Sequence, residues 1–256
     1  MVHFVGAGPG AVDLITVRGS KYLQEADVVI YAGSLVNPEL LTLCREGVEI
    51  YNSAEMDLPE IIEAMRKAYA EGKTVVRLHT GEPSLYGAVR EQMDALDRLG
   101  IPYDSCPGVT AAFGAAAALN MEFTLPGVSQ SLIITRMAGR TSVPEYESIE
   151  SMAAHQCSMA IYLSSGMLPE LARRLLIGGR SPDTPVAVIY KATWPEEKRV
   201  HTTLSRMAEE AAKAGIDRTA VVLVGDAVIG SGYMNSKLYD PAFETGYRSA
   251  KEPGKL

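Results

Sequence analysis

The sequence predicts an α/β protein made of two domains. Three observations carry this prediction: short runs rich in Val, Ile and Leu alternate with amphipathic stretches, the runs fall into two sets separated by a break at Pro126-Gly127, and 256 residues suffice for two buried cores. Strands that are apolar on both faces and separated by helices are typical of covered parallel sheets, so we expect the first set to form a largely parallel sheet.

The first set of runs predicts four strands with helices between them. The strands are expected in HFVGAG, DVVIYAG, VEIYNS and TVVRLHTG, and the helices in TVRGSKYLQEA, PELLTLC and LPEIIEAMRKAYAEG. In the last of these helices the spacing puts Ile61, Ile62, Met65 and Ala68 on one face, and Gly72 marks its end.

The second set predicts four more strands, in SLIITR, SMAIYLSS, PVAVIYKAT and TAVVLVG. Helices are expected in the alanine-rich run AAFGAAAALN and in MLPELARRLLIGG and SRMAEEAAKAG. The predicted domains are residues 1–112 and 113–240. The polar, turn-rich tail of residues 241–256 is expected to be partly disordered.

Composition limits the classes of function. A formal net charge of -7 disfavours nucleic-acid binding, and no run approaches the roughly 20 apolar residues of a membrane helix. Three separated cysteines and no signal-peptide pattern favour a cytoplasmic protein without disulfides. No histidine or cysteine spacing indicates a bound metal.

The opening GAGPGA, residues 6 to 11, matches the glycine-rich turn of dinucleotide-binding Rossmann proteins. Two features oppose an NAD-binding oxidoreductase: Pro9 has no N–H for a pyrophosphate, and the next strand has Asp27 at its beginning, not an acid at its end. A plain tight turn explains the glycines equally well. The motif alone therefore leaves the function open.

Longer strings resemble the tetrapyrrole methylase family. VGAGPGAVDLITVRG (5–19) and VVRLHTGEPSLYG (75–87) are similar to its two signatures, and YDSCPGVTAA, AIYLSS and TAVVLVG follow in family order. IYAGSLVNPELL, TLPGVSQSLIITRMAGRT and VAVIYKATWPEEK resemble the members that methylate carbon 11 of precorrin-4 or cobalt-precorrin-4 in cobalamin biosynthesis.

The resemblance implies the tetrapyrrole methylase fold, with S-adenosylmethionine in a cleft between two α/β domains and S-adenosylhomocysteine as product. It also implies a homodimer. Small and apolar positions suit recognition of this donor by main-chain groups. Carried over by position, the implied donor contacts are Pro9, Gly81, Glu82, Leu85, Tyr86, Thr110, Ala111, Tyr162, Leu163, Ala192, Thr219 and Ala220.

A precorrin carries many carboxylates, so an acidic protein must hold it with focused positive charge. Arginine pairs bidentately with such groups. The expected substrate-binding residues are Arg18, Arg90, Arg136, Arg140 and Lys191. For each of them, and for Glu91 as a possible proton acceptor, an ordinary solvated charge is the competing explanation, and no catalytic residue is assigned.

Two departures from the family pattern occur, Glu82 in place of the usual Asp and Ala11 in place of a frequent Asp. The first could shift a hydrogen bond to the donor. Three other functions remain open: a sister tetrapyrrole methylase acting at another ring carbon, such as a uroporphyrinogen-III methyltransferase, a Rossmann-type NAD-binding oxidoreductase, and a non-catalytic binding protein of the same fold.

Overall fold

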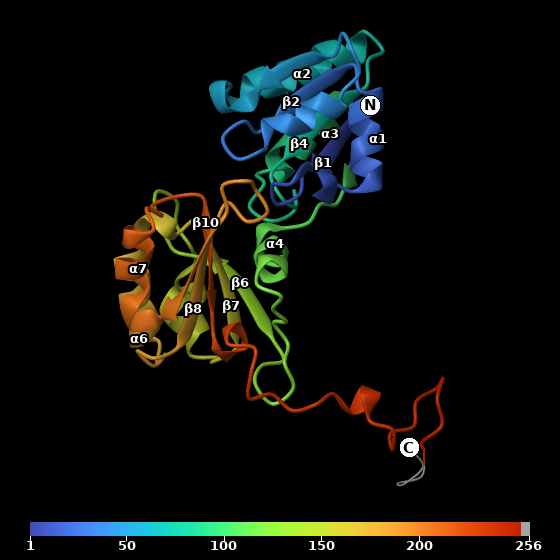
Figure 1. The fold of residues 1–256 in the computed structure, drawn as a ribbon. Helices are drawn as coiled ribbons and strands as arrows, with labels where there is room; N and C mark the ends of the chain where they lie inside the picture. The colour runs from blue at the N-terminus through green and yellow to red at the C-terminus, as the bar shows by residue number, and fades with distance from the viewer. Residues whose placement is uncertain (252–256) are drawn as a thin grey trace. The chain divides into compact units, whose positions relative to one another are not determined.

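The chain forms two compact α/β units, here in a computed structural model that describes residues 1–251 of the 256 (Figure 1). The first unit comprises Met1–Ala118 together with Tyr190–Lys198, and the second comprises Leu119–Ile189 and the chain from Arg199 onward. The sequence predicted that the first domain ends at residue 112 and the second begins at residue 113. That position lies inside α4 (Ala111–Ala118), whereas the units divide after this helix.

The first unit contains a five-stranded sheet in the order β3-β2-β4-β1-β5. The pairings β1–β4, β1–β5, β2–β4 and β2–β3 are all parallel, as expected. The strands are β1 (Val2–Gly6), β2 (Val28–Tyr31), β3 (Glu49–Asn52), β4 (Val75–His79) and β5 (Tyr103–Cys106). The helices are α1 (Val17–Glu25), α2 (Leu58–Ala70), α3 (Arg90–Leu99) and α4, with short 3-10 turns η1 (Val12–Leu14), η2 (Pro38–Leu43) and η3 (Ser53–Glu55).

Local sequence explains where the helices begin and end. Asp57 and Glu60 form a reciprocal capping box at the start of α2, and Thr16 accepts a hydrogen bond from the Gly19 N–H in α1. Gly100 ends α3 in the left-handed region. The segment PELLTLC was predicted as a helix, but it forms the 3-10 turn η2 behind the Asn37 cap.

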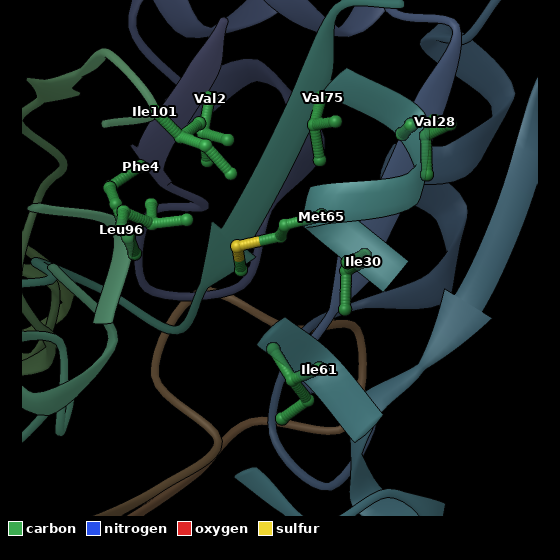
Figure 2. Packing of buried hydrophobic residues seen from close by; sticks show 10 residues of the cluster. Val2, Phe4, Val28, Ile30, Ile61, Met65, Val75, Leu96 and Ile101 are labelled. Atoms are coloured by element: carbon green, nitrogen blue, oxygen red, sulfur yellow. The ribbon is translucent and has the colours of Figure 1, made fainter. Parts of the chain in front are cut away.

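Helices cover both faces of the first sheet. Ile61 and Met65 of α2 and Leu96 of α3 pack against Phe4 and Val28 on one face (Figure 2). Leu23 of α1 packs with Val5 and Leu78 on the opposite face. The first of these layers buries the predicted apolar face of α2, except that Ile62 is only half-buried.

The second unit contains a five-stranded sheet in the order β6-β7-β10-β8-β9. Its β6–β7 pair is parallel and its β7–β10 pair is antiparallel, so this sheet is mixed. The strands are β6 (Leu132–Arg136), β7 (Ser158–Tyr162), β8 (Pro185–Tyr190), β9 (Lys198–Thr203) and β10 (Ala220–Val224). The helices are α5 (Ile149–Ala153), α6 (Leu168–Ile177) and α7 (Met207–Lys213).

The chain after β10 continues through the turns η7 (Asp226–Val228) and η8 (Lys237–Tyr239). A bridge between Thr245 and Arg248 closes a further turn. Part of the predicted disordered tail, residues 252–256, lies outside the described residues.

Candidate functional site

The first sheet changes its direction of winding between β1 and β4. These strands are neighbours, but α1, which follows β1, covers one face, while α3, which follows β4, covers the other. In open α/β sheets, ligands bind beyond the carboxyl ends of strands at such a switch point. The turns after β1, β4 and β5 therefore form the candidate site of the first unit.

The three turns lie against one another at glycines. Gly8 and Gly81 exchange backbone hydrogen bonds, with the Gly81 N–H donating over 3.0 Å and the Gly8 N–H over 3.3 Å. A Cβ on Gly6 would lie 2.6 Å from the Gly108 Cα, and a Cβ on Gly108 would lie 2.1 Å from the Gly81 carbonyl oxygen. Since no side chain fits there, the glycines permit this close backbone approach.

Glu82 ties the turn after β4 to the turn after β5. Its carboxylate accepts hydrogen bonds from the N–H groups of Ser84 and Gly108, both at 2.9 Å. Partial burial raises the pKa of the Glu82 carboxyl, but the hydrogen bonds from Ser84 and Gly108 outweigh it and hold this pKa below its ordinary value. The acid that departs from the family pattern thus bonds to the protein's own backbone.

The glycine turn after β1 has its polar backbone groups capped by side chains. The Trp194 Nε1–H donates to the Pro9 carbonyl at 3.1 Å, and the Asn37 Nδ2–H donates to the Gly10 carbonyl at 2.9 Å. The Ala11 N–H donates to Thr193 Oγ1 at 3.0 Å. Sequence reasoning missed Asn37, Thr193 and Trp194, although TWP lies in a string already singled out by its resemblance.

A buried polar chain supports the segment after β4. Arg77 Nε–H donates to Gln92 Oε1 at 3.0 Å and its Nη1–H to the Ile30 carbonyl at 3.1 Å, while Gln92 Nε2–H donates to the Ala88 carbonyl at 3.1 Å. Ala88 and Tyr86 have left-handed backbones, with φ of 49° and 58°. Such strain persists where surrounding contacts fix it.

Two buried side chains here have perturbed acidity. Burial lowers the pKa of Arg77 to about 10. Burial, and secondarily the charge of Arg77, lower the pKa of His79 to about 3. The His79 Nε2 is buried without a hydrogen-bond partner among the described residues. His79 is therefore a neutral imidazole near neutral pH.

Eight of the residues expected to contact the donor lie in the first unit, and several are brought together. A Cβ on Gly81 would lie 3.6 Å from the Thr110 Cα, and one on Gly114 of α4 would lie 2.6 Å from the Pro9 Cβ. Glu82 joins this group through Gly108. The eight residues are Pro9, Gly81, Glu82, Leu85, Tyr86, Thr110, Ala111 and Ala192.

The other four expected donor contacts, Tyr162, Leu163, Thr219 and Ala220, lie in the second unit. Tyr162 ends β7 and Ala220 begins its antiparallel neighbour β10. Both residues therefore lie at the same end of these two strands. Leu163 and Thr219 have left-handed backbones, with φ of 52° and 50°. Their assignment as donor contacts stays a prediction.

The expected substrate-binding cations differ in availability. Arg90 forms ion pairs with Asp94 and Asp97 on α3, and Arg136 donates to the carbonyls of Met137, Thr141 and Ser142. Lys191 lies 4.6 Å from the centre of the Trp194 ring and 3.5 Å from Glu196.

Arg18 and Arg140 are exposed, and within residues 1–251 neither has a hydrogen-bond or ion-pair partner. Arg18, Arg90 and Lys191 belong to the first unit, and Arg136 and Arg140 to the second.

A cavity of about 850 Å³ in the first unit lies beside the glycine turn. It is lined by residues of η1, α1 and η2 and by Thr193, Trp194 and Pro195, and none of the predicted site residues lines it. Arg136 lines a smaller cavity of about 350 Å³ in the second unit. Over the described part of the chain, no group of His, Cys, Asp and Glu could hold a metal ion, and no helix could span a membrane.

Comparisons with known proteins identify the family of the chain. The family model of the Tetrapyrrole (Corrin/Porphyrin) Methylases matches residues 1–208. The cobalt-precorrin-4 C(11)-methyltransferase of Methanocaldococcus jannaschii is 51% identical over 249 residues, covering 97% of this chain and 96% of the relative.

Two solved structures are also similar. A cobalt precorrin-4 methyltransferase aligns with a TM-score of 0.87 at 46% identity, covering 89% of this chain and 95% of the other. A uroporphyrin-III C-methyltransferase from Thermus thermophilus in complex with S-adenosylhomocysteine aligns with a TM-score of 0.74 at 29% identity, covering 89% of this chain and 92% of the other.

Proposed function

The chain belongs to the tetrapyrrole methylase family, and from this membership we propose that it is an S-adenosylmethionine-dependent methyltransferase of cobalamin biosynthesis. Its substrate is precorrin-4 or cobalt-precorrin-4, its product is methylated at ring carbon 11, and the donor leaves as S-adenosylhomocysteine. One observation carries the proposal: a relative named for this reaction is 51% identical over 97% of the chain.

The first unit fits a methyl donor of this kind. The turns after β1, β4 and β5 approach so closely that side chains are excluded at Gly6 and Gly108, which leaves backbone to face a ligand. Pro9, Gly81, Thr110 and Ala192 would hold the donor there by shape and main-chain groups. Tyr162, Leu163, Thr219 and Ala220 of the second unit are proposed to complete its contacts.

The sulfonium of S-adenosylmethionine supplies an activated methyl group and a neutral leaving group. The protein therefore needs no nucleophile of its own, and its contribution is to align the reacting carbons and exclude water. Left-handed residues such as Tyr86 and Leu163 fix the backbone at proposed contacts. The proposal assigns no catalytic acid or base.

The acidic substrate is held by localised cations. Among the described residues Arg18 and Arg140 have unengaged guanidinium groups, which makes them the first choices for carboxylate binding. Lys191 is oriented by the Trp194 ring. Arg90 and Arg136 are already bonded to protein groups, so they hold the substrate only by giving up those bonds.

An NAD-binding oxidoreductase is the weaker alternative. A pyrophosphate on the glycine turn needs free backbone N–H groups. Here the Ala11 N–H is bonded to Thr193, and the Gly8 N–H to Gly81. Sister methylases that act at another ring carbon remain the alternative within the family, because they differ in substrate position and not in the donor.

We also propose a homodimer located in the cytoplasm. The segment after η7 supports dimerisation, because several of its large apolar side chains are exposed. Tyr239 is 80% exposed and Tyr247 is 104% exposed. The sparse, unpaired cysteines support a reducing compartment.

Two measurements test the proposed function. Calorimetry should detect binding of S-adenosylhomocysteine and none of NAD; binding of NAD alone would overturn the proposal. Incubation with S-adenosylmethionine carrying a ¹³C-methyl group and either precorrin-4 or cobalt-precorrin-4 should add one methyl, and NMR should locate it on carbon 11. A methyl on another ring carbon would assign the chain to a sister activity, and the ratio of rates would show which form of the ring is the substrate.

A further inference from the structure

Trp194 packs against the glycine turn after β1, which is part of the candidate site. Its indole N–H donates to the Pro9 carbonyl, and its ring lies on Gly10. A Cβ on Gly10 would lie 2.0 Å from the Trp194 Cδ1 and 2.2 Å from its Nε1. Gly10 has no left-handed backbone, so the indole ring is what excludes a side chain at this position.

Thr193 holds the next residue of the same turn. Its hydroxyl accepts from the Ala11 N–H, and its own N–H donates to Glu197 Oε2 at 2.6 Å. Thr193 has a φ of 71°, which is unusual for a β-branched residue. Such a conformation costs free energy and persists only where its surroundings enforce it.

The segment Lys191–Glu197 is held in shape by contacts within itself. Lys191 also has a left-handed backbone, and its ammonium lies over the Trp194 ring. The Trp194 N–H donates to the Lys191 carbonyl, and the Glu197 N–H to the Trp194 carbonyl. The indole therefore has defined contacts with Gly10 and with Lys191.

We propose that Trp194 and Thr193 are positioning residues that hold Pro9, Gly10 and Ala11 in the shape that binds the methyl donor. This inference rests on the proposed function. Without the two side chains, the Pro9 carbonyl and the Ala11 N–H lose their partners and the turn can rearrange toward other partners or water. The donor then meets a turn that must be ordered during binding, so its affinity falls.

Single substitutions separate the two contacts. Trp194→Phe keeps an aromatic ring and removes the N–H, and Thr193→Val removes the hydroxyl at similar volume, with Thr193→Ser as the variant that should restore binding. Loss of either hydrogen bond is expected to raise the Kd of S-adenosylhomocysteine and the KM of S-adenosylmethionine by about tenfold, with kcat changed by less than about twofold. Tyr69→Leu on α2, an exposed aromatic, is the matched control and should behave like the unsubstituted protein.

A double-mutant cycle tests the packing of the ring on Gly10. Gly10→Ala should displace the indole, shift the emission of this single tryptophan and weaken binding of S-adenosylhomocysteine by about tenfold. In a Trp194→Ala background there is no ring to displace, so Gly10→Ala should then change the Kd by less than about twofold.

Three results would overturn the inference. The first is additive effects of Gly10→Ala and Trp194→Ala. The second is a fall in kcat at unchanged KM, which would indicate only a smaller folded fraction. The third is binding by Trp194→Phe and Thr193→Val as tight as in the unsubstituted protein. If the unsubstituted protein itself fails to bind S-adenosylhomocysteine, the proposed function falls and the inference with it.

Discussion

At the scale of single residues, His79 makes stability sensitive to acid. Its folded pKa of about 3 lies below the ordinary 6.5, because burial and the Arg77 charge oppose protonation. Below pH 6.5 the unfolded chain therefore binds a proton that the folded chain refuses. The contribution of His79 to the free energy of unfolding is therefore fully present above pH 6.5. It declines as the pH falls toward 3, by up to about 1.4 kcal/mol per pH unit.

His79→Phe should remove this part of the pH dependence. It also removes a buried nitrogen without a partner among the described residues, so the variant should be at least as stable near pH 5. Urea unfolding at pH 7, 6, 5 and 4 would measure both effects, with the exposed His155→Phe as control. An unchanged slope in His79→Phe would contradict the prediction.

Glu82 is an acid and His79 a base, but the titration of Glu82 also lowers the stability of the protein as the pH falls. Its folded pKa is held below the ordinary value of about 4.3, so its contribution is complete above that value and is lost as pH falls through the folded pKa. At pH 7, Glu82→Gln replaces one acceptor oxygen by an amide facing a backbone N–H of Ser84 or Gly108.

The expected cost of Glu82→Gln is about 1–2 kcal/mol in unfolding free energy at pH 7, shrinking below pH 4. Urea unfolding at pH 7 and at a pH below 4 would measure this loss. Glu63→Gln, which breaks an exposed ion pair with Arg66, should cost less than about 0.5 kcal/mol. An equal loss for Glu82→Gln at both pH values would show that the carboxylate is not bonded as described.

At the scale of elements, Gln92 connects β2 and β4 to the segment before α3 through Arg77 and Ala88. Gln92→Leu leaves the buried guanidinium with a lost partner and should destabilise the protein by about 2–3 kcal/mol. Gln92→Glu keeps an acceptor for Arg77 and loses only the donor to Ala88, so it should be intermediate. Urea unfolding would measure the loss of unfolding free energy in each variant. Equal losses in the two variants would show that the hydrogen bond from Gln92 to Arg77 does not stabilise the strained segment.

Elements with a periodic apolar pattern could be predicted from the sequence, and two edge strands could not. The helix of α2 was predicted because Ile61, Ile62, Met65 and Ala68 recur on one face and Gly72 marks its end. The strands β5 and β9 were missed because YDSC and KRVHTT are mostly polar and contain no run of Val, Ile and Leu. Their position at a sheet edge was not the obstacle, because β3 and β6 are edge strands too and were predicted.

The site divides in the same way. Gly81 and Glu82 were expected at the site from a local motif, because the turn after β4 is formed by neighbours in sequence, and their contact with the donor stays a prediction. Asn37 and Trp194 cap the glycine turn from 27 and 185 residues away. Only the fold brings such partners together. Likewise, the sequence could not tell that Arg90 is neutralised by acids one and two turns along α3.

At the scale of the whole molecule, the net charge and the family membership indicate which ligands the chain binds. The segment of residues 237–248 indicates how the protein assembles. Arg248 Nη2–H groups donate to the carbonyls of Leu238, Asp240 and Phe243. This guanidinium closes the chain into a defined loop that presents Tyr239, Phe243 and Tyr247 to solvent. Exposed aromatic side chains are typical of protein interfaces, where they contribute much of the binding energy.

Light scattering during gel filtration should therefore find a dimer in solution, and Tyr239→Ser combined with Tyr247→Ser should shift it toward monomer. Both protomers carry the two substitutions, so four anchors are lost; at about 1 kcal/mol each, the dimer Kd should rise by about 1,000-fold. Tyr146→Ser removes a tyrosine that is 74% exposed elsewhere in the second unit and should leave the dimer intact. A dimer that survives the double substitution would place the interface on another surface, and a monomeric unsubstituted protein would refute the homodimer altogether.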